Sequence, residues 1–197
     1  QLKRAKVQSS PYRFVLAWFL KTCEGYDGYK EFFEEKERQR QIEIADSEKL
    51  EDGWILDSQG QIIKPDKRTN NSCNYSTELI NGKIYQEWYH THPCGMVPSP
   101  ADLYKLGFAY NKGRIDPENF SYGIISRYGI ITLVISSIDN FDLFYKMMSD
   151  DSIKNEYNTI VGGTKNFNDA IKELTKYLKN NNSGLNVISC PISDNDS

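Results

Sequence analysis

The two histidines of this 197-residue chain, His90 and His92, lie two positions apart in the stretch EWYHTHPCGMVPSPADLYKLG. On a β-strand, residues i and i+2 project from the same face, so the two imidazoles can point at one atom. Neutral imidazole is a good zinc ligand, and a catalytic zinc typically has three protein ligands and an open fourth position for water. Asp102 is the nearest candidate for the third ligand, because the prolines and glycine that precede it can turn the chain back towards the strand end.

The segment Ser99-Pro100-Ala101-Asp102 also has a purely structural interpretation. Ser99 is a suitable N-cap, Pro100 suits the first helical position, and Asp102 would face the positive end of the helix dipole. A lone His-x-His pair is likewise more often a surface or packing feature than a metal site. The metal hypothesis therefore depends on the histidines and this acid occurring together. Capping and ligation are compatible, since a cap would hold the acid in place.

The motif HTHPCGMVPSPAD resembles the His-x-His-Pro…Ser-x-x-Asp signature of the JAMM (JAB/MPN-type) zinc metalloproteases. In that family a glutamate lies upstream near the start of an early strand, and LEDGWILDSQG resembles the bacterial versions through Glu51, with Glu48 as the second candidate. The order of expected elements over residues 29–137 also resembles the family. Six residues separate His92 from Ser99, one fewer than is usual there, whereas the Ser-x-x-Asp spacing is intact.

The resemblance implies a zinc-dependent hydrolase that cleaves a peptide or isopeptide bond in a protein or peptide substrate. His90, His92 and Asp102 would hold the zinc, which lowers the pKa of a bound water from 15.7 to about 7. Glu51 would act as the general base, and the Ser99 hydroxyl would donate a hydrogen bond to the oxyanion. These roles are implied by the resemblance and not by the spacing alone.

Two alternatives use the same stretch differently. Cys94, two residues after His92, could be the nucleophile of a Cys-His hydrolase, although that would leave Asp102 and Glu51 unexplained. An MPN-type protein-interaction module could instead retain zinc without turnover, and a fourth ligand from Cys94 would close such a site. The aromatic residues Tyr85, Trp88 and Tyr89 could line a substrate groove, but strand aromatics more often belong to the core.

The remaining sequence predicts one α/β domain, in which a central mixed β-sheet is flanked by helices. The boundaries expected are a helical segment at 1–46, a JAB/MPN-like domain at 47–180 and a mobile C-terminal tail at 181–197. Within the domain, periodicity and turn signals predict hairpins at 53–65 and 121–137, a strand at 83–92, helices at 100–112, 141–149 and 166–179, and a loop at 66–77. Glu87 lies in the histidine strand, but at an odd position that points to the opposite face.

Composition excludes some classes of function. The chain has 24 basic and 27 acidic residues, a net charge of −3, so it lacks the basic excess typical of nucleic-acid binding. The apolar run FVLAWFL at 14–20 is too short for a membrane span and is expected to be a core helix. The chain begins at Gln1, so we expect a processed or truncated N-terminus and cannot assign a compartment. The four cysteines form no CxxC pair and leave the disulfide state open; they are Cys23, Cys73, Cys94 and Cys190.

Overall fold

A computed structural model of the chain describes residues 50–93, 95–126 and 128–191. The helical segment expected at 1–46 lies outside the described residues, as do Glu48 and Cys94. Both histidines, Ser99, Asp102 and Glu51 lie within them.

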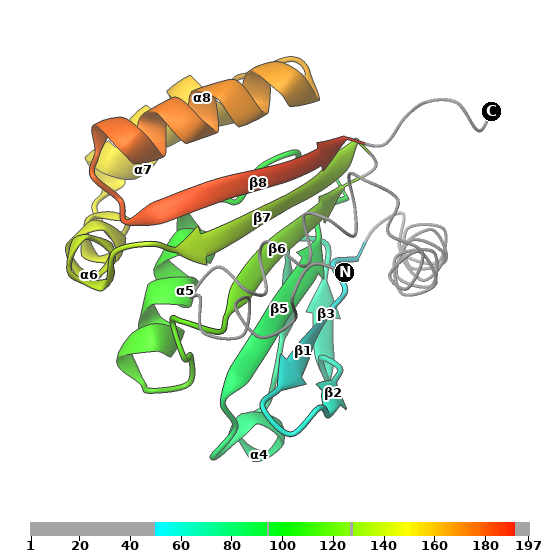
Figure 1. Ribbon diagram of the computed structural model, residues 1–197. Coiled ribbons are helices and arrows are strands. Elements are labelled where there is room, and N and C mark those ends of the chain that lie inside the picture. The colour runs from blue at the N-terminus through cyan, green and yellow to red at the C-terminus, as the bar shows by residue number, and fades with distance from the viewer. Residues whose placement is uncertain (1–49, 94, 127, 192–197) are drawn as a thin grey trace, which may run out of the picture.

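The described chain forms a six-stranded sheet with a small hairpin and a series of helices (Figure 1). The sheet order is β2-β1-β5-β6-β7-β8, and a separate two-stranded sheet pairs β3 with β4. The strands are β1 (Gly53–Asp57), β2 (Ile62–Ile63), β3 (Lys67–Thr69), β4 (Ser72–Asn74), β5 (Tyr85–Thr91), β6 (Ser121–Ser126), β7 (Gly129–Ile135) and β8 (Leu185–Pro191). The helices are α4 (Thr77–Ile80), α5 (Pro100–Asn111), α6 (Ile138–Met147), α7 (Asp151–Tyr157), the π-helical turn η1 (Asn158–Gly162) and α8 (Phe167–Asn180).

The sheet is mixed, because β5 and β6 run parallel while the other neighbouring strands of the sheet run antiparallel. Parallel neighbours need a long crossover connection, and the segment that contains α5 provides it. The chain therefore leaves β5 at Thr91 and enters α5 at Pro100, close to that strand end. This connection brings the histidine strand and the acid-bearing helix together.

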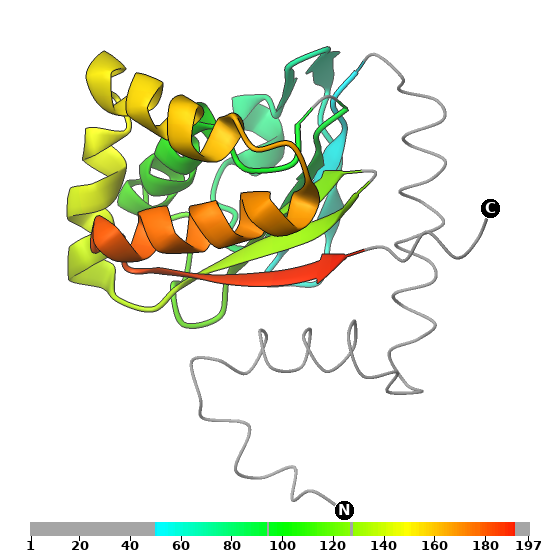
Figure 2. The ribbon, with the colours of Figure 1, turned by 90° about the horizontal axis from the view of Figure 1, so that it is seen from above.

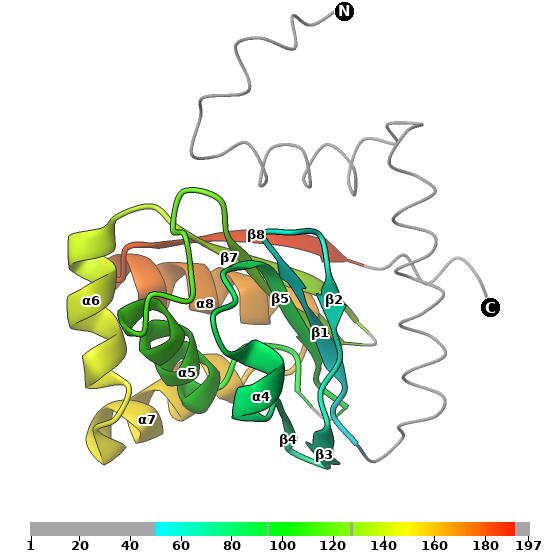
Figure 3. The ribbon, with the colours of Figure 1, turned by 90° about the horizontal axis from the view of Figure 1, so that it is seen from below.

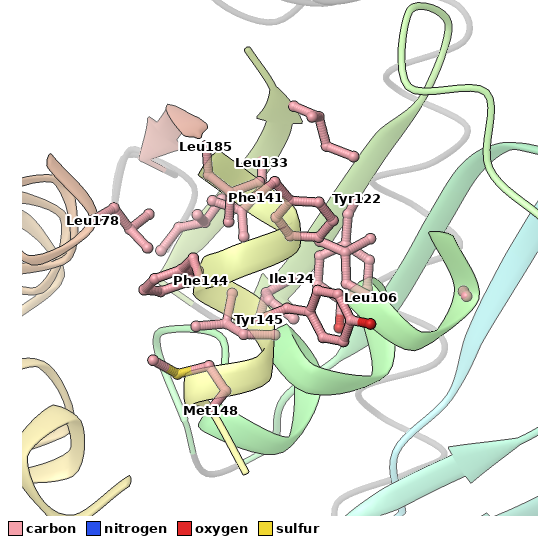
Figure 4. Packing of buried hydrophobic residues seen from close by; sticks show 14 of the residues in the cluster. Leu106, Tyr122, Ile124, Leu133, Phe141, Phe144, Tyr145, Met148, Leu178 and Leu185 are labelled. Carbon is pink, nitrogen blue, oxygen red and sulfur yellow. The ribbon is translucent and has the colours of Figure 1, made fainter. Parts of the chain in front are cut away.

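The helices α5, α6, α7 and α8 lie on one side of the sheet, as two further views show (Figure 2, Figure 3). The main core fills the space between them and the sheet. In it Phe141, Phe144 and Met148, in and just after α6, meet Leu106 of α5 and Tyr122 of β6 (Figure 4). Each of these side chains is no more than 1% exposed, so burial of apolar area holds α5 against the sheet.

A smaller apolar cluster forms on the other face of the sheet. Trp54 of β1 stacks on Tyr89 of β5 with ring centroids 5.3 Å apart, and Ile125 and Ile130 complete the cluster. From Glu87 to Thr91 the strand alternates regularly, so Tyr89 points to this face whereas Trp88 packs on the main core; Tyr85, beyond a register shift, also packs on the main core. The alternation confirms that Glu87 points away from the face that carries His90 and His92.

The predicted α/β class is confirmed, and so are the two hairpins, the histidine strand and the helices beginning near 100 and 166. Two predictions are wrong. The segment 66–77, expected to be a loop, contains the β3–β4 hairpin and the start of α4. The tail expected to be mobile from 181 forms β8, because Leu185–Pro191 pairs antiparallel with β7 at the sheet edge. The helix α7 was not predicted.

Among the described helices, none combines the length and apolarity that a membrane crossing requires.

Candidate metal centre

His90 and His92 stand at the end of β5, on the face that α5 covers. His90 pairs in register with Gly53 of β1 and with Ile124 of β6, so the strand is fixed on both sides. A Cβ atom on Gly53 would lie 3.0 Å from the His90 Cα and Cβ atoms and 2.3 Å from the Tyr89 carbonyl oxygen. The absence of a side chain at Gly53 therefore allows β1 to approach the histidine strand closely.

Asp102 is held by a capping box at the start of α5. Its Oδ2 accepts hydrogen bonds from the Ser99 backbone N–H and from the Ser99 hydroxyl, both at 2.7 Å. In return the Ser99 hydroxyl accepts from the Asp102 N–H at 3.2 Å, and Pro100 occupies the first turn. The predicted cap is thus confirmed. It fixes Oδ2 and leaves Oδ1 directed at His90.

The two imidazoles and the carboxylate converge. The distances are 2.9 Å between His90 Nε2 and His92 Nε2, 3.3 Å between His90 Nε2 and Asp102 Oδ1, and 3.2 Å between His92 Nε2 and Asp102 Oδ2. Two ligands of a tetrahedral zinc with bonds of about 2.0–2.1 Å are separated by about 3.3–3.4 Å. The two histidine–carboxylate separations lie near this value, although they involve different oxygens, Oδ1 facing His90 and Oδ2 facing His92. The separation of the two Nε2 atoms is shorter, at 2.9 Å. Among the described residues, these three form the group that could hold a metal ion.

Both imidazole rings also interact with groups outside the cluster. His90 Nδ1 lies 3.4 Å from the Tyr122 hydroxyl, at the long end of the hydrogen-bond range. His92 hydrogen-bonds to the Val97 backbone, and its Nδ1 faces Gly95 in the loop. If His90 Nδ1 donates to Tyr122, the tautomer of that ring is fixed and its Nε2 lone pair is left for a metal. Tyr157 supports the loop, since its hydroxyl donates to the Pro98 carbonyl oxygen at 2.6 Å.

The three side chains are largely buried, and Asp102 and His92 each affect the protonation of the other. Burial alone would raise the pKa of Asp102, but the charges and hydrogen bonds of His90 and His92 outweigh it and hold that pKa well below its usual range. Burial would lower the pKa of His92, but its hydrogen bond with Asp102 and the charges of Asp102 and Glu51 raise it. Without a metal, the site therefore favours an ionised Asp102 carboxylate and a protonated His92. A divalent cation needs the same ionised carboxylate but neutral imidazoles, so its binding would release the proton from His92.

Glu51 lies two residues before β1, the strand that pairs with the histidine strand β5. The neighbouring Asp52 carbonyl accepts from the Thr91 N–H at 2.8 Å, and the Asp52 N–H donates to the Thr91 hydroxyl at 2.9 Å. On the other side, the Glu51 N–H donates to the Thr69 carbonyl at 2.7 Å, and Arg68 pairs with Asp52 at 2.8 Å. These bonds anchor the Glu51 backbone between β5 and the β3–β4 hairpin.

The Glu51 carboxyl lies within electrostatic range of the cluster. Partial burial raises its pKa above the ordinary value of 4.5, and Asp102 adds to the rise. The imidazoles of His90 and His92 and the ammonium of Lys105 act in the opposite direction without cancelling it. The sequence did not single out Tyr122 or Tyr157 as site residues, because each comes from an element distant in sequence and no local pattern marks it.

No protein-family model matches the chain, and a search of the curated proteins finds no match either. The assignment of function therefore depends on the chemistry of the site.

Proposed function

We propose that the chain is a zinc-dependent hydrolase of the JAMM type, which cleaves an amide bond in a protein or peptide. The observation that carries the proposal is the convergence of His90, His92 and Asp102 within 4.8 Å, together with a carboxylic acid, Glu51, whose pKa their charges influence. The mixed sheet and the order of the glutamate, the histidine strand and the acid-bearing helix support this assignment.

The donor set suits zinc. His90 and His92 would each supply Nε2, and Asp102 would supply Oδ1, because Oδ2 already accepts two hydrogen bonds from Ser99. Three such ligands leave a coordination position for solvent, as is typical of catalytic sites. A bound zinc supplies Lewis acidity, which acidifies a coordinated water and polarises a carbonyl group.

Glu51 is the proposed general base. Its carboxylate would take a proton from the attacking water and pass it to the leaving amine. A carboxyl group that is partly buried has a pKa closer to the working pH than a solvated one, which improves it as a base and later as an acid. The bonds of its backbone to β3 and of Asp52 to β5 anchor the Glu51 backbone, and its carboxyl lies within electrostatic range of the proposed metal ligands.

Ser99 is the proposed oxyanion donor. Its hydroxyl hydrogen points to Asp102 Oδ2 in this structure, so donation to a substrate requires that hydrogen to rotate. The Ser99 backbone N–H would still hold Oδ2 during this rotation, so the carboxylate keeps its position. Removal of one oxyanion donor typically lowers the rate about 10²–10³-fold.

The test combines metal analysis with turnover. Zinc-loaded protein is incubated with a peptide library, and cleavage is detected by mass spectrometry. We expect Glu51→Gln to keep its zinc and lose cleavage, because the amide cannot accept the proton. The matched control is Glu118→Gln, an exposed glutamate outside the proposed site, which should retain both. A Glu51→Gln protein that cleaves as fast as the wild type, or a zinc-loaded wild type that cleaves nothing, would contradict the proposal.

A further inference from the structure

A cavity of about 350 Å³ lies between β4, β5 and α5. This volume is at the lower end of the range of about 300–1,000 Å³ that ligand pockets occupy. Its walls are mainly apolar and aromatic, and those used below are Tyr85 and Trp88 of β5 and Tyr104 and Phe108 of α5. The cavity is thus of a size and polarity to take one large apolar side chain.

The cavity adjoins the candidate metal centre. Trp88 and His90 point to the same face of β5, two residues or about 6–7 Å apart along the strand. On α5, Lys105 lines the cavity one helical turn after Asp102. Lys105 also acts electrostatically on the Glu51 carboxyl, so it is within electrostatic range of the proposed base. A peptide held at the metal centre could therefore place a neighbouring side chain in the cavity.

The aromatic walls differ in how firmly they are held. Trp88 makes edge contacts with Tyr85 at 6.0 Å and with Tyr122 at 5.4 Å, which fix its plane. Its indole N–H is buried and has no hydrogen-bond partner among the residues that the structure describes. Tyr104 and Phe108, which are 39% and 48% exposed, stand four residues apart on α5 and form an open apolar rim. The fixed inner wall and the exposed rim suit an entering aromatic group.

Two cationic side chains line the cavity. Lys105 and Arg114 both line it, and among the described residues neither forms an ion pair. Lys105 is exposed, so a carboxylate from solvent can reach it. The same two cations would repel a lysine or arginine side chain.

We propose that this cavity is the specificity pocket of the protein, and that it receives an aromatic residue of a peptide whose adjacent residue is acidic and pairs with Lys105. The proposal rests on the proposed function, because it places the aromatic residue next to the bond that is cleaved. The proposal also predicts that the metal-free protein binds such a peptide without cleaving it, because none of the pocket residues named is a proposed metal ligand or the proposed base.

The first experiment measures kcat/KM of the zinc-loaded protein on peptides that are acetylated and amidated, so that side chains carry the only carboxylates. Next to the cleaved bond the peptides contain Phe-Glu, Phe-Gln or Ala-Glu. We expect Phe-Glu to exceed Ala-Glu by about tenfold or more, because a buried phenyl ring leaves water. We expect Phe-Glu to exceed Phe-Gln by about two- to fivefold, as an exposed ion pair allows.

Two variants assign the preferences to the pocket. Phe108→Ala should reduce cleavage of the Phe peptides and leave Ala-Glu unchanged. Lys105→Gln should abolish the difference between Phe-Glu and Phe-Gln. Both side chains are exposed, so neither substitution should prevent folding. Leu143→Ala, at a residue of α6 that is 67% exposed and lies outside the cavity, is the control and should behave as the wild type.

The second experiment titrates the same peptides into metal-free protein and follows tryptophan fluorescence. We expect saturable binding of the Phe-Glu peptide and a response that Trp88→Phe removes. If the zinc-loaded protein cleaves nothing but this binding preference holds, the proposed function fails and the pocket stands. If the peptides bind the metal-free protein without preference, or not at all, the pocket proposal is overturned. Equal cleavage of all three peptides would overturn it as well.

Discussion

Gly53→Ala perturbs the contact between β1 and the histidine strand. The added Cβ would lie 2.3 Å from the Tyr89 carbonyl oxygen, whereas ordinary contacts begin near 3.4 Å, so β1 and β5 must separate by about 1 Å. Both partners in this contact are backbone or Cβ atoms that cannot swing away. The cost of such overpacking is about 1–3 kcal/mol. For a chain of this size, that lowers Tm by about 2–12 °C.

The displacement should also reach the metal centre, because the same Cβ would touch His90 at 3.0 Å. We expect the zinc affinity to fall about 10–100-fold, the range seen when the support of a ligand is disturbed. The assays are thermal unfolding of the metal-free protein and competitive zinc titration.

Gly162→Ala is the matched control. Its Cβ would meet its nearest neighbours at 3.8 Å and 3.9 Å, which is ordinary contact. We expect its stability to stay within about 0.5 kcal/mol of the wild type and its zinc affinity to be unchanged. If Gly53→Ala matched the wild type in both assays, the close approach of β1 to the histidine strand would be refuted.

Two further predictions concern groups outside the metal centre. Asp57 accepts bonds from two backbone N–H groups of its turn and from Lys83 at 2.9 Å; burial opposes ionisation, but these bonds lower its pKa below 3.8. Its stabilisation is therefore present above the unfolded-state pKa of about 3.9 and is lost as the pH falls through the lower folded-state pKa. In urea unfolding at pH 7, Asp57→Asn should lower the free energy of unfolding by about 1–3 kcal/mol relative to the wild type. This difference between the two proteins should become smaller below about pH 4. A difference that does not change with pH would contradict the prediction. Burial raises the pKa of the Cys73 thiol to about 12. Iodoacetamide at about pH 8 should therefore modify Cys73 only when urea unfolds the protein. Rapid labelling of Cys73 in the native protein would contradict its burial.

The parts of the site that could be predicted depend on local patterns. The two-residue period of a strand placed His90 and His92 on one face, and the serine–proline start of α5 placed Asp102 at a capping position. Both follow from residues within a few positions of each other. The position of Glu51 also follows from a pattern, because a glycine and apolar residues begin β1 two residues after it. The catalytic roles of Glu51 and Ser99 stay predictions.

The parts that were missed depend on contacts between distant segments. β8 contains the apolar residues Leu185, Val187 and Ile188, but it follows the asparagine run at 180–182 and precedes a polar C-terminus, so the sequence around it does not indicate a strand. It becomes a strand because its backbone pairs with the buried β7. The β3–β4 hairpin has one buried side chain, Cys73, so no hydrophobic alternation revealed it. Tyr122 reaches His90 only through the parallel register of β5 and β6, which single-sequence patterns do not encode.

The most direct test of the central claim is the zinc content of the protein after reconstitution and removal of excess metal. We predict about one zinc per chain for the wild type, in agreement with one three-ligand site. The double substitution of His90 and His92 by alanine should remove it, and Asp102→Ala should weaken it. Full zinc content in the double variant, or no retained zinc in the wild type, would contradict the convergence of these three side chains on one metal ion.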